Sequence, residues 1–243
     1  MTMLSRVVLI AAIMISPLTV SAVDEFSVKN QIEGLAAYYT LAGDYYDDSG
    51  NNNHGDIRSG TAASYAVDHL GNADGAYYFD GSGNSLSFGS GISLRIARTI
   101  SISFWVKPQS LTDGNIMGRF LNTTHSSGWG FWYQEKKFYF SVGSEVAEQI
   151  CVSDAGYDID AYYHVVGVYD KQKGYLALYI NGKPVFEKQN YKDGTIESKG
   201  GTLTFGTFPT QTAAYFKGCL EDVRIYNAVL KPETIEALFK ATK

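Results

Sequence analysis

Two stretches of sequence decide the fold: YYHVVGVYDKQKGYLALYINGKPV at residues 162–185 and FKGCLEDVRIYNAVLKPETIEAL at residues 216–238. In the first stretch, two runs of apolar and aromatic residues lie on either side of the polar, glycine-ended segment 170–174. Such a pattern predicts two antiparallel strands joined by a tight turn, and Asn181-Gly182 predicts a second turn directly after them. The chain is therefore expected to be built from short paired strands.

More short strands are expected upstream, separated by glycine-bearing turns. Residues 99–107 alternate so that Ile102 and Phe104 share one face, as in a strand with one side in the core. Only the end of the chain favours a helix, because Pro232 suits a first helical position and apolar residues within 235–239 fall on one helical face. The other expected strands cover residues 35–41, 76–79, 85–88, 128–133, 138–142 and 202–205.

Composition agrees with this pattern. The 243 residues include 18 Tyr, 13 Phe and 25 Gly but only 5 Pro, which is typical of many short strands between turns. The sequence thus predicts an all-β protein, a two-sheet antiparallel sandwich or jelly roll with a short C-terminal helix, as one domain at 34–243 after a lead-in at 23–33. A net charge of -5 without a Lys/Arg cluster argues against a nucleic-acid partner.

The N-terminus has the anatomy of a secretory signal peptide. Arg6 supplies positive charge, residues 7–15 form an apolar run, and Val20-Ser21-Ala22 ends in a small-residue cleavage motif. The run is shorter than the roughly 20 residues of a membrane-spanning helix, and no later segment is long and apolar enough to span. We therefore predict cleavage after a signal at 1–22 and export, to a periplasm or outside the cell.

The two cysteines, Cys151 and Cys219, would enter a compartment in which disulfides persist. A bond between them would stabilise the fold by about 4 kcal/mol in the chain-entropy description. Two buried free thiols are the alternative, and the sequence leaves both open. No metal or redox motif surrounds either residue.

Five blocks follow one another along the chain: AYYTLAGDYYDDSGNNNHG at 37–55, YYFDGSGNSLSF at 77–88, ISFWVKP at 102–108 and the two stretches quoted above. In this order the blocks resemble the laminin-G-like, concanavalin A-like lectin/glucanase jelly-roll family. The resemblance implies two packed antiparallel sheets, frequently a structural calcium ion, and frequently a carbohydrate-binding or adhesive role. The chain departs from the family pattern at Tyr163-His164, where Trp often precedes His, and at Glu221, where Asp is usual.

An acidic, Asn-rich loop at 43–60 offers ligands for such a calcium ion, which takes six to eight oxygens. The family topology pairs the first strand antiparallel with the last, so residues near Glu221 would lie beside this loop. Strict alternation would also place Glu221 on the core-facing side with Val223 and Ile225, where a buried carboxylate needs a cation or donors. The predicted calcium ligands are Asp48, Asn51, Asp80, Glu221 and Asp222.

A second interpretation of the same residues needs no metal. The loop side chains would accept hydrogen bonds from local backbone N–H groups in Asx turns, and Glu221 or Asp222 would pair with Arg224 or a lysine.

The segment SSGWGFWYQ at 126–134 is the candidate carbohydrate-binding surface. Alternation places Trp129, Phe131 and Tyr133 on one side of a strand and Trp132 and Gln134 on the other. Aromatic rings stack on the apolar faces of sugars while amide groups select hydroxyls, although aromatic residues on sandwich strands are more often part of the core. The predicted ligand-binding residues are Trp129, Trp132, Tyr133 and Gln134.

Catalytic motifs are missing from the sequence. The glucanases of this fold carry Glu-x-Asp-x-x-Glu, whose carboxylates act as nucleophile and acid, and here no Glu is followed two positions later by Asp. His164 lies in an apolar strand-like run and is interpreted as structural. We therefore predict a secreted, non-catalytic carbohydrate-binding domain with a structural calcium ion; the alternatives are a secreted glycan-active enzyme, lyase or hydrolase, and a protein-binding adhesion or structural module.

Overall fold

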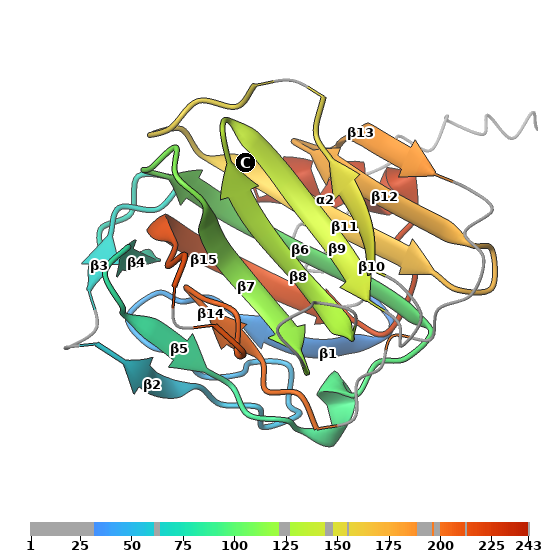
Figure 1. The fold of residues 1–243 in the computed structure, drawn as a ribbon, viewed down its shortest axis with the longest axis horizontal. Helices are drawn as coiled ribbons and strands as arrows, with labels where there is room; N and C mark the ends of the chain where they lie inside the picture. Colours follow the sequence, from blue (N-terminus) through green and yellow to red (C-terminus); the bar gives the residue numbers. More distant parts are fainter. Residues whose placement is uncertain are drawn as a thin grey trace, which may run out of the picture.

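The computed structural model describes residues 32–60, 64–121, 127–143, 148–154, 156–188, 196, 200–211 and 213–242. Two antiparallel sheets stack face to face in this part of the chain (Figure 1). The large sheet contains β1 (Leu35–Tyr39), β3 (Tyr65–Ala66), β4 (Ala76–Asp80), β6 (Thr99–Pro108), β11 (Tyr163–Asp170), β12 (Tyr175–Ile180), β13 (Lys183–Lys188) and β15 (Lys217–Tyr226). The small sheet contains β2 (Asp56–Ser59), β5 (Ser85–Ser87), β7 (Gly114–Phe120), β8 (Gly128–Gln134), β9 (Lys137–Gly143), β10 (Glu148–Val152) and β14 (Thr204–Phe205).

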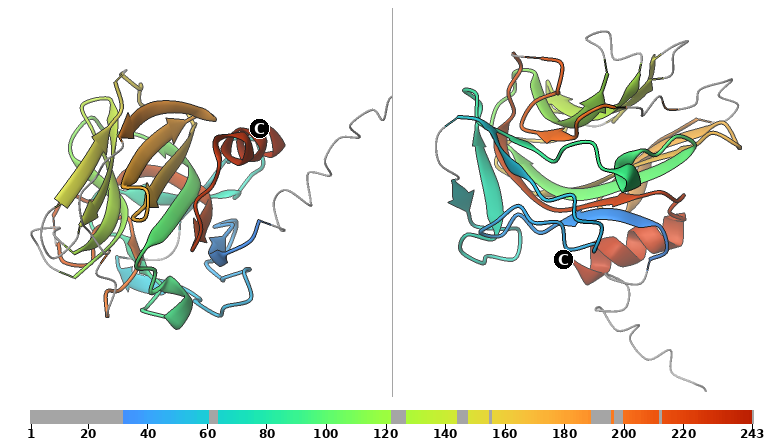
Figure 2. Two further views of the ribbon diagram at one scale, coloured as in Figure 1. Left: turned by 90° about the vertical axis from the view of Figure 1, so that its right-hand side faces the viewer. Right: turned by 90° about the horizontal axis from the view of Figure 1, so that it is seen from below.

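The strand order runs β13-β12-β11-β6-β15-β4-β3 in the large sheet, with β1 also paired to β15, and β10-β9-β8-β7-β14-β5-β2 in the small sheet. Both sheets curve in the same direction, and helix α2 (Pro232–Ala241) lies on the outer side of the large sheet (Figure 2). The 3-10 turn η1 (Ile92–Leu94) precedes β6. The predicted two-sheet antiparallel sandwich with a C-terminal helix is confirmed.

The core between the sheets forms because inward side chains largely alternate with outward ones along the strands. Phe104 and Phe131 meet edge to face across the sandwich at 4.9 Å between ring centroids, and Phe131 stacks on Phe140 at 4.5 Å. Gly167 on β11 faces these rings, and a Cβ atom there would lie 2.5 Å from Phe131 Cζ. The absence of a side chain at Gly167 is thus part of the packing of the two sheets.

A second apolar cluster joins the outer face of the large sheet to helix α2. Val166 and Tyr179 of the sheet pack with Ile235 and Leu238 of the helix, and all four side chains are buried. The helix begins at Pro232, whose missing N–H is not needed in a first turn. This packing fixes the C-terminal residues against the sheet.

Strand β15 breaks the strict alternation on which the calcium prediction relied. Asp222 has a left-handed φ of 52°, and the register between β15 and β6 shifts between Glu221 and Arg224. Such a bulge adds one residue to the strand, so side chains before and after it no longer follow one alternation. Glu221 pairs with Trp105, on the outer face of the large sheet, whereas Val223 remains in the core. Placing Glu221 on the Val223 face was therefore wrong.

The disulfide expectation is also wrong. Cys151 and Cys219 are both free and buried. Cys151 belongs to the core between the sheets through β10, whereas Cys219 lies in the central strand β15, where its thiol neighbours Tyr162 and Lys107. Burial raises the pKa of both thiols, which disfavours the reactive thiolate.

Two predictions from the sequence concern residues that lie, partly or wholly, outside the described ranges. The signal peptide at 1–22 and most of the lead-in at 23–33 lie outside the described residues. In the part of the chain that the structure describes, we find no helix with the length and apolar character required to cross a membrane.

We expect Gly167→Ala to destabilise the protein by about 1–3 kcal/mol, because an added methyl group overpacks the Phe131–Phe140 stack. Urea unfolding followed by fluorescence measures this loss. Gly156→Ala is the matched control, since a Cβ there would lie 3.6 Å from its closest neighbour, on Lys136. Equal stability of the two variants would contradict the packing role given to Gly167.

Candidate functional site

The acidic loop after β1 is held by one buried carboxylate, that of Asp47. Its Oδ1 accepts the backbone N–H groups of Tyr38 at 3.0 Å and Ser49 at 2.9 Å. Its Oδ2 accepts the backbone N–H and the side-chain amide of Asn53, both at 2.9 Å. Burial acts to raise the pKa of Asp47, but these hydrogen bonds outweigh it and hold the pKa below its ordinary value. The loop thus gains its shape from local hydrogen bonds.

The predicted calcium ligands come from three parts of the fold. Asp48 and Asn51 are exposed in the loop, where the Asn51 amide donates to the carbonyls of Leu35 and Ala36. Asp80 ends β4, and its carboxylate accepts the N–H of Ser82 in the β4–β5 turn. Glu221 and Asp222 lie in β15. Within the described ranges, no three His, Cys, Asp or Glu side chains gather closely enough to hold a metal ion.

The last two of these residues have protein partners. Asp222 forms an ion pair of 2.5 Å with the buried Arg224, whose guanidinium stacks 4.4 Å from the ring centre of Tyr38. Glu221 accepts the backbone N–H of His69 at 2.9 Å and contacts His69 Nδ1 at 3.0 Å. The ion pair between Asp222 and Arg224 that the second interpretation expects is therefore present, while the partner of Glu221 is a histidine that the sequence did not indicate.

His69 ties the β3–β4 loop to the end of helix α2. Its ring stacks on Trp105 at 3.9 Å, and its Nε2 bonds the carbonyl oxygen of Thr242. The indole Nε1 of Trp105 donates to Thr242 Oγ1 at 2.9 Å. These contacts, which we call the His69 cluster, adjoin a pocket of about 160 Å³ that Glu221 and Arg224 also line.

Both acid–base groups of the His69 cluster hold their protons more tightly than usual. Burial raises the pKa of Glu221, and the bond to His69 offsets only part of this shift. For His69, burial acts to lower the pKa, but the bonds to Glu221 and to the Thr242 carbonyl raise it above its ordinary value. Loss of a proton from either group is thus disfavoured, and Nε2–H of His69 donates to the Thr242 carbonyl, which can only accept.

The aromatic strand β8 divides its side chains between two faces, as alternation predicts. Trp129, Phe131 and Tyr133 point into the core and are at most 1 % exposed. The assignments of Trp129 and Tyr133 as ligand-binding residues were therefore wrong, because both rings are buried in the core between the sheets. Trp132 and Gln134 lie on the outer face and are partly exposed.

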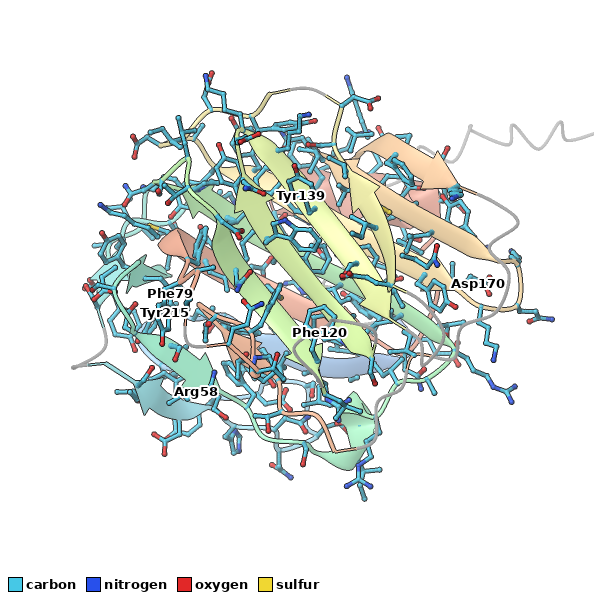
Figure 3. All side chains as sticks on the ribbon, in the orientation of Figure 1. Arg58, Phe79, Phe120, Tyr139, Asp170 and Tyr215 are labelled. Carbon is cyan, nitrogen blue, oxygen red and sulfur yellow. The ribbon has the colours of Figure 1, made fainter. Side chains whose placement is uncertain are left out.

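Trp132 is the centre of a row that crosses three strands of the small sheet. It pairs with Asn115 of β7 on one side and with Tyr139 of β9 on the other. Its ring stacks on that of Tyr139 at 4.8 Å and 10°, and it meets Phe208 edge to face at 6.3 Å. Figure 3 shows Tyr139 and Phe120 on the outer face of this sheet.

Next to this row lies a pocket of about 210 Å³, here called the Trp132 pocket. Phe208 reaches over the glycines of β7 and β8: a Cβ at Gly118 would lie 2.7 Å from the Phe208 ring, and one at Gly130 would lie 2.8 Å from it. Ile150, which is 41 % exposed, adds an apolar wall. The lining residues are Asp113, Asn115, Trp132, Glu148, Ile150, Phe208 and Gln211.

Polar groups enter the pocket from three elements. The Asn115 amide donates to Gln211 Oε1 at 2.5 Å, which fixes both amides. Asp113 comes directly before β7, at the end of the sheet where Phe138 lies in β9. Glu148 begins β10 and pairs with Gly143, at the other end of β9. The two carboxylates therefore lie at opposite ends of the pocket.

Sequence reasoning found Trp132 but not its partners. Strands β7 and β10 were not predicted, because GNIMGRF and EQICV lack a clear alternation, and they carry Asn115, Glu148 and Ile150. Phe208 and Gln211 come from the loop after β14, whose position depends on tertiary pairing. Gln134, the predicted partner of Trp132, does not line the pocket.

Comparison with known proteins gives one family match and distant relatives. The family described as the concanavalin A-like lectin/glucanases superfamily matches residues 56–236. A pentraxin-related protein of Bos taurus, PTX3, is 25 % identical over 146 residues, which cover 56 % of this chain and 37 % of that protein. The chain thus spans well under half the length of this curated relative.

Solved structures share the fold at low identity. The botulinum neurotoxin serotype D binding domain has a TM-score of 0.69 at 16 % identity, covering 90 % of this chain and 52 % of that one. Domain 4 of AbnA, an extracellular arabinanase of family GH43 from Geobacillus stearothermophilus, solved with arabinotriose, has a TM-score of 0.68 at 22 % identity, covering 84 % and 98 %. A serotype D neurotoxin domain solved with N-acetylneuraminic acid has a TM-score of 0.67 at 16 % identity, covering 89 % and 52 %.

The His69 cluster predicts that stability declines as pH rises. Because the folded-state pKa values of Glu221 and His69 both exceed their ordinary values of 4.5 and 6.5, their contribution is complete at low pH and is lost as pH rises through the raised values. Each proton contributes a slope of at most about 1.4 kcal/mol per pH unit. Urea unfolding between pH 5 and 9 measures the slope, which we expect to be shallower in Glu221→Gln.

Asp56→Asn, which changes a carboxylate on the far edge of the small sheet, is the control and should keep the wild-type slope. Identical slopes for wild type and Glu221→Gln would show that the cluster does not retain the proton.

Proposed function

We propose that this chain, which belongs to the concanavalin A-like lectin/glucanases superfamily, is a non-catalytic carbohydrate-binding domain of an exported protein. The observation that carries the proposal is the Trp132 pocket, in which a partly exposed indole lies beside fixed amide and carboxylate groups on an outer sheet face. The fold alone would not suffice, because one fold hosts many functions.

The chemistry of the pocket suits a sugar ring. Tyr139 and Phe208 hold the Trp132 indole in place, so little side-chain freedom is lost when a ligand stacks on it. The amides of Asn115 and Gln211 lie beside it and offer directional hydrogen bonds to hydroxyl groups. A volume of about 210 Å³ is smaller than the roughly 300–1,000 Å³ of enclosing small-molecule sites, which suits one sugar unit of a longer glycan.

The position of the carboxylates favours binding over catalysis. Glycoside hydrolysis uses two carboxyl groups that flank a single bond. In the Trp132 pocket, Asp113 and Glu148 enter from opposite ends of the strands instead. His164 does not offer a lyase base, since it is buried beside Ser103, and burial together with the charge of Arg224 lowers its pKa to about 3.

Two structural neighbours support a carbohydrate ligand. The arabinanase domain was solved with arabinotriose and a neurotoxin domain with N-acetylneuraminic acid. Export is supported by the signal-peptide pattern at 1–22, and the first of these neighbours belongs to an extracellular enzyme. We propose that this chain acts outside the cell or in a periplasm on a glycan or a glycosylated surface.

We expect Trp132→Ala to weaken glycan binding by about tenfold or more, because truncating an aromatic anchor at the centre of a binding site typically costs roughly 2 kcal/mol. A glycan array finds the ligand, and titration calorimetry with the best oligosaccharide measures the loss. Tyr46→Ala, which removes an aromatic side chain that is 59 % exposed elsewhere, is the matched control and should bind normally.

Wild-type affinity in Trp132→Ala would contradict the assignment of this pocket. Binding only to proteins would favour the adhesion module, and cleavage of an array glycan would favour the enzyme.

Calcium binding stays a prediction from the sequence and the family resemblance; among the described residues no three His, Cys, Asp or Glu side chains gather as they would around a metal ion. An ion that binds only the folded chain stabilises it by about 2.7 kcal/mol at 100 times its Kd, roughly 5–10 °C in Tm for this size. Titrating chelator-treated protein with calcium while following Tm tests this. A Tm that stays constant up to millimolar calcium would exclude a structural calcium ion.

A further inference from the structure

We propose that Asn115 is the specificity-determining residue of the Trp132 pocket, where its side-chain carbonyl oxygen accepts a hydrogen bond from one hydroxyl group of the bound sugar unit. The pocket therefore takes sugar units in which this hydroxyl is free and rejects units in which it is methylated, acylated or missing. This inference rests on the proposed function and names the chemical group that the same site recognises.

A β-bulge in β7 places Asn115 beside Trp132. Asn115 pairs with Trp132 and Met117 pairs with Phe131, so Ile116 is an extra residue in β7. Ile116 and Met117 are both buried in the core, whereas Asn115 lines the pocket on the outer face. Bulges re-aim side chains in this way. Directly paired residues on one face have Cβ atoms about 4.5–5.5 Å apart, so the Asn115 amide is a close neighbour of the indole.

One face of the Trp132 indole looks toward Asn115. Tyr139 of β9 stacks on the indole in a nearly parallel arrangement, with 10° between the ring planes. Because β8 lies between β9 and β7, the opposite face of the indole looks toward β7. Asn115 and its partner Gln211, which both line the pocket, lie on this side. A sugar ring stacked on this face has one edge beside Asn115.

Two contacts hold Asn115 in place and use its donors. Its backbone N–H donates to the carbonyl oxygen of Ala214 at 2.8 Å, and its Nδ2 donates to Gln211 Oε1 at 2.5 Å. The remaining polar atom of the side chain is Oδ1, which can only accept. Within the part of the chain that the structure describes, no hydrogen-bond donor contacts this oxygen. Asn115 therefore offers a sugar an acceptor of fixed orientation.

Burial makes this acceptor selective. Asn115 is 3 % exposed, so a ligand that covers Oδ1 without donating to it leaves a buried polar atom unpaired. A ligand hydroxyl group supplies the missing donor, and little side-chain freedom is lost because the amide is already held. Sites that bond a substrate hydroxyl reject the analogue without it more strongly than apolar pockets reject an extra methylene. Hydrogen bonding to Asn115 thus selects among sugars that stack equally well on Trp132.

A double-mutant cycle between protein and ligand tests this role by titration calorimetry with the full chain. The parent ligand is the tightest binder among arabinotriose, cellotriose, galactotriose, sialyllactose and the glycans of the array, and it is compared with versions that each lack one hydroxyl group. We expect one deoxy version to bind wild-type protein about tenfold or more weakly than the parent. In Asn115→Leu, which has no acceptor, the ratio of these two affinities should fall toward one.

Three further variants complete the experiment. Asn115→Asp keeps an acceptor oxygen and should keep the ratio above one. Asn115→Ala removes the amide without filling its space and should give the same ratio as Asn115→Leu, so it replaces that variant if leucine prevents folding. Asn227→Leu makes the matched exchange at an exposed position after β15 and should keep the wild-type ratio.

The outcomes separate the two proposals. If the parent binds through Trp132 but every deoxy version binds wild-type protein equally well, the role of Asn115 is overturned and the carbohydrate-binding proposal stands. A wild-type ratio in Asn115→Leu or Asn115→Ala, at wild-type Tm, has the same meaning. If no probe and no array glycan binds through Trp132, the proposed function and the inference both fail.

Discussion

The structure depends on one constraint. Two sheets can stack only if the strands of each sheet point apolar side chains toward the other sheet. In the small sheet, Trp129, Phe131 and Tyr133 therefore point into the core. Because side chains alternate along the strand, Trp132 lies on the opposite face, where it packs against the sheet surface and neighbouring rings. The exposed indole is therefore a consequence of core packing as much as of any ligand.

One local departure from this constraint shapes the other side of the molecule. The bulge at Asp222 keeps Val223 in the core while it turns Glu221 outward to His69. The bulged backbone is itself held, because the N–H of Asp222 donates to the carbonyl of Thr40 at 3.1 Å. Glu221, the buried carboxylate for which the sequence required a cation or donors, thus has the donors of His69.

The two polar sites lie on opposite outer faces of the sandwich. The Trp132 pocket is on the small sheet, and the His69 cluster is on the large sheet. The two sheets form separate layers, with helix α2 outside the large one (Figures 1 and 2). The apolar core separates them, so titration of the His69 cluster can change stability without changing the charge of the pocket.

The sequence by itself determined the sandwich, its main hairpins, the C-terminal helix and the division of the side chains of residues 129–134 between two faces, because periodicity and turn residues are local properties. It missed β7 and β10, whose pairing comes from neighbours rather than from their own pattern. Only the tertiary structure decided that Glu221 meets His69 and that Asn115, Glu148 and Phe208 surround Trp132. A bulge shifts register by one residue and loops converge across long sequence separations, and neither event leaves a periodic signal in the chain.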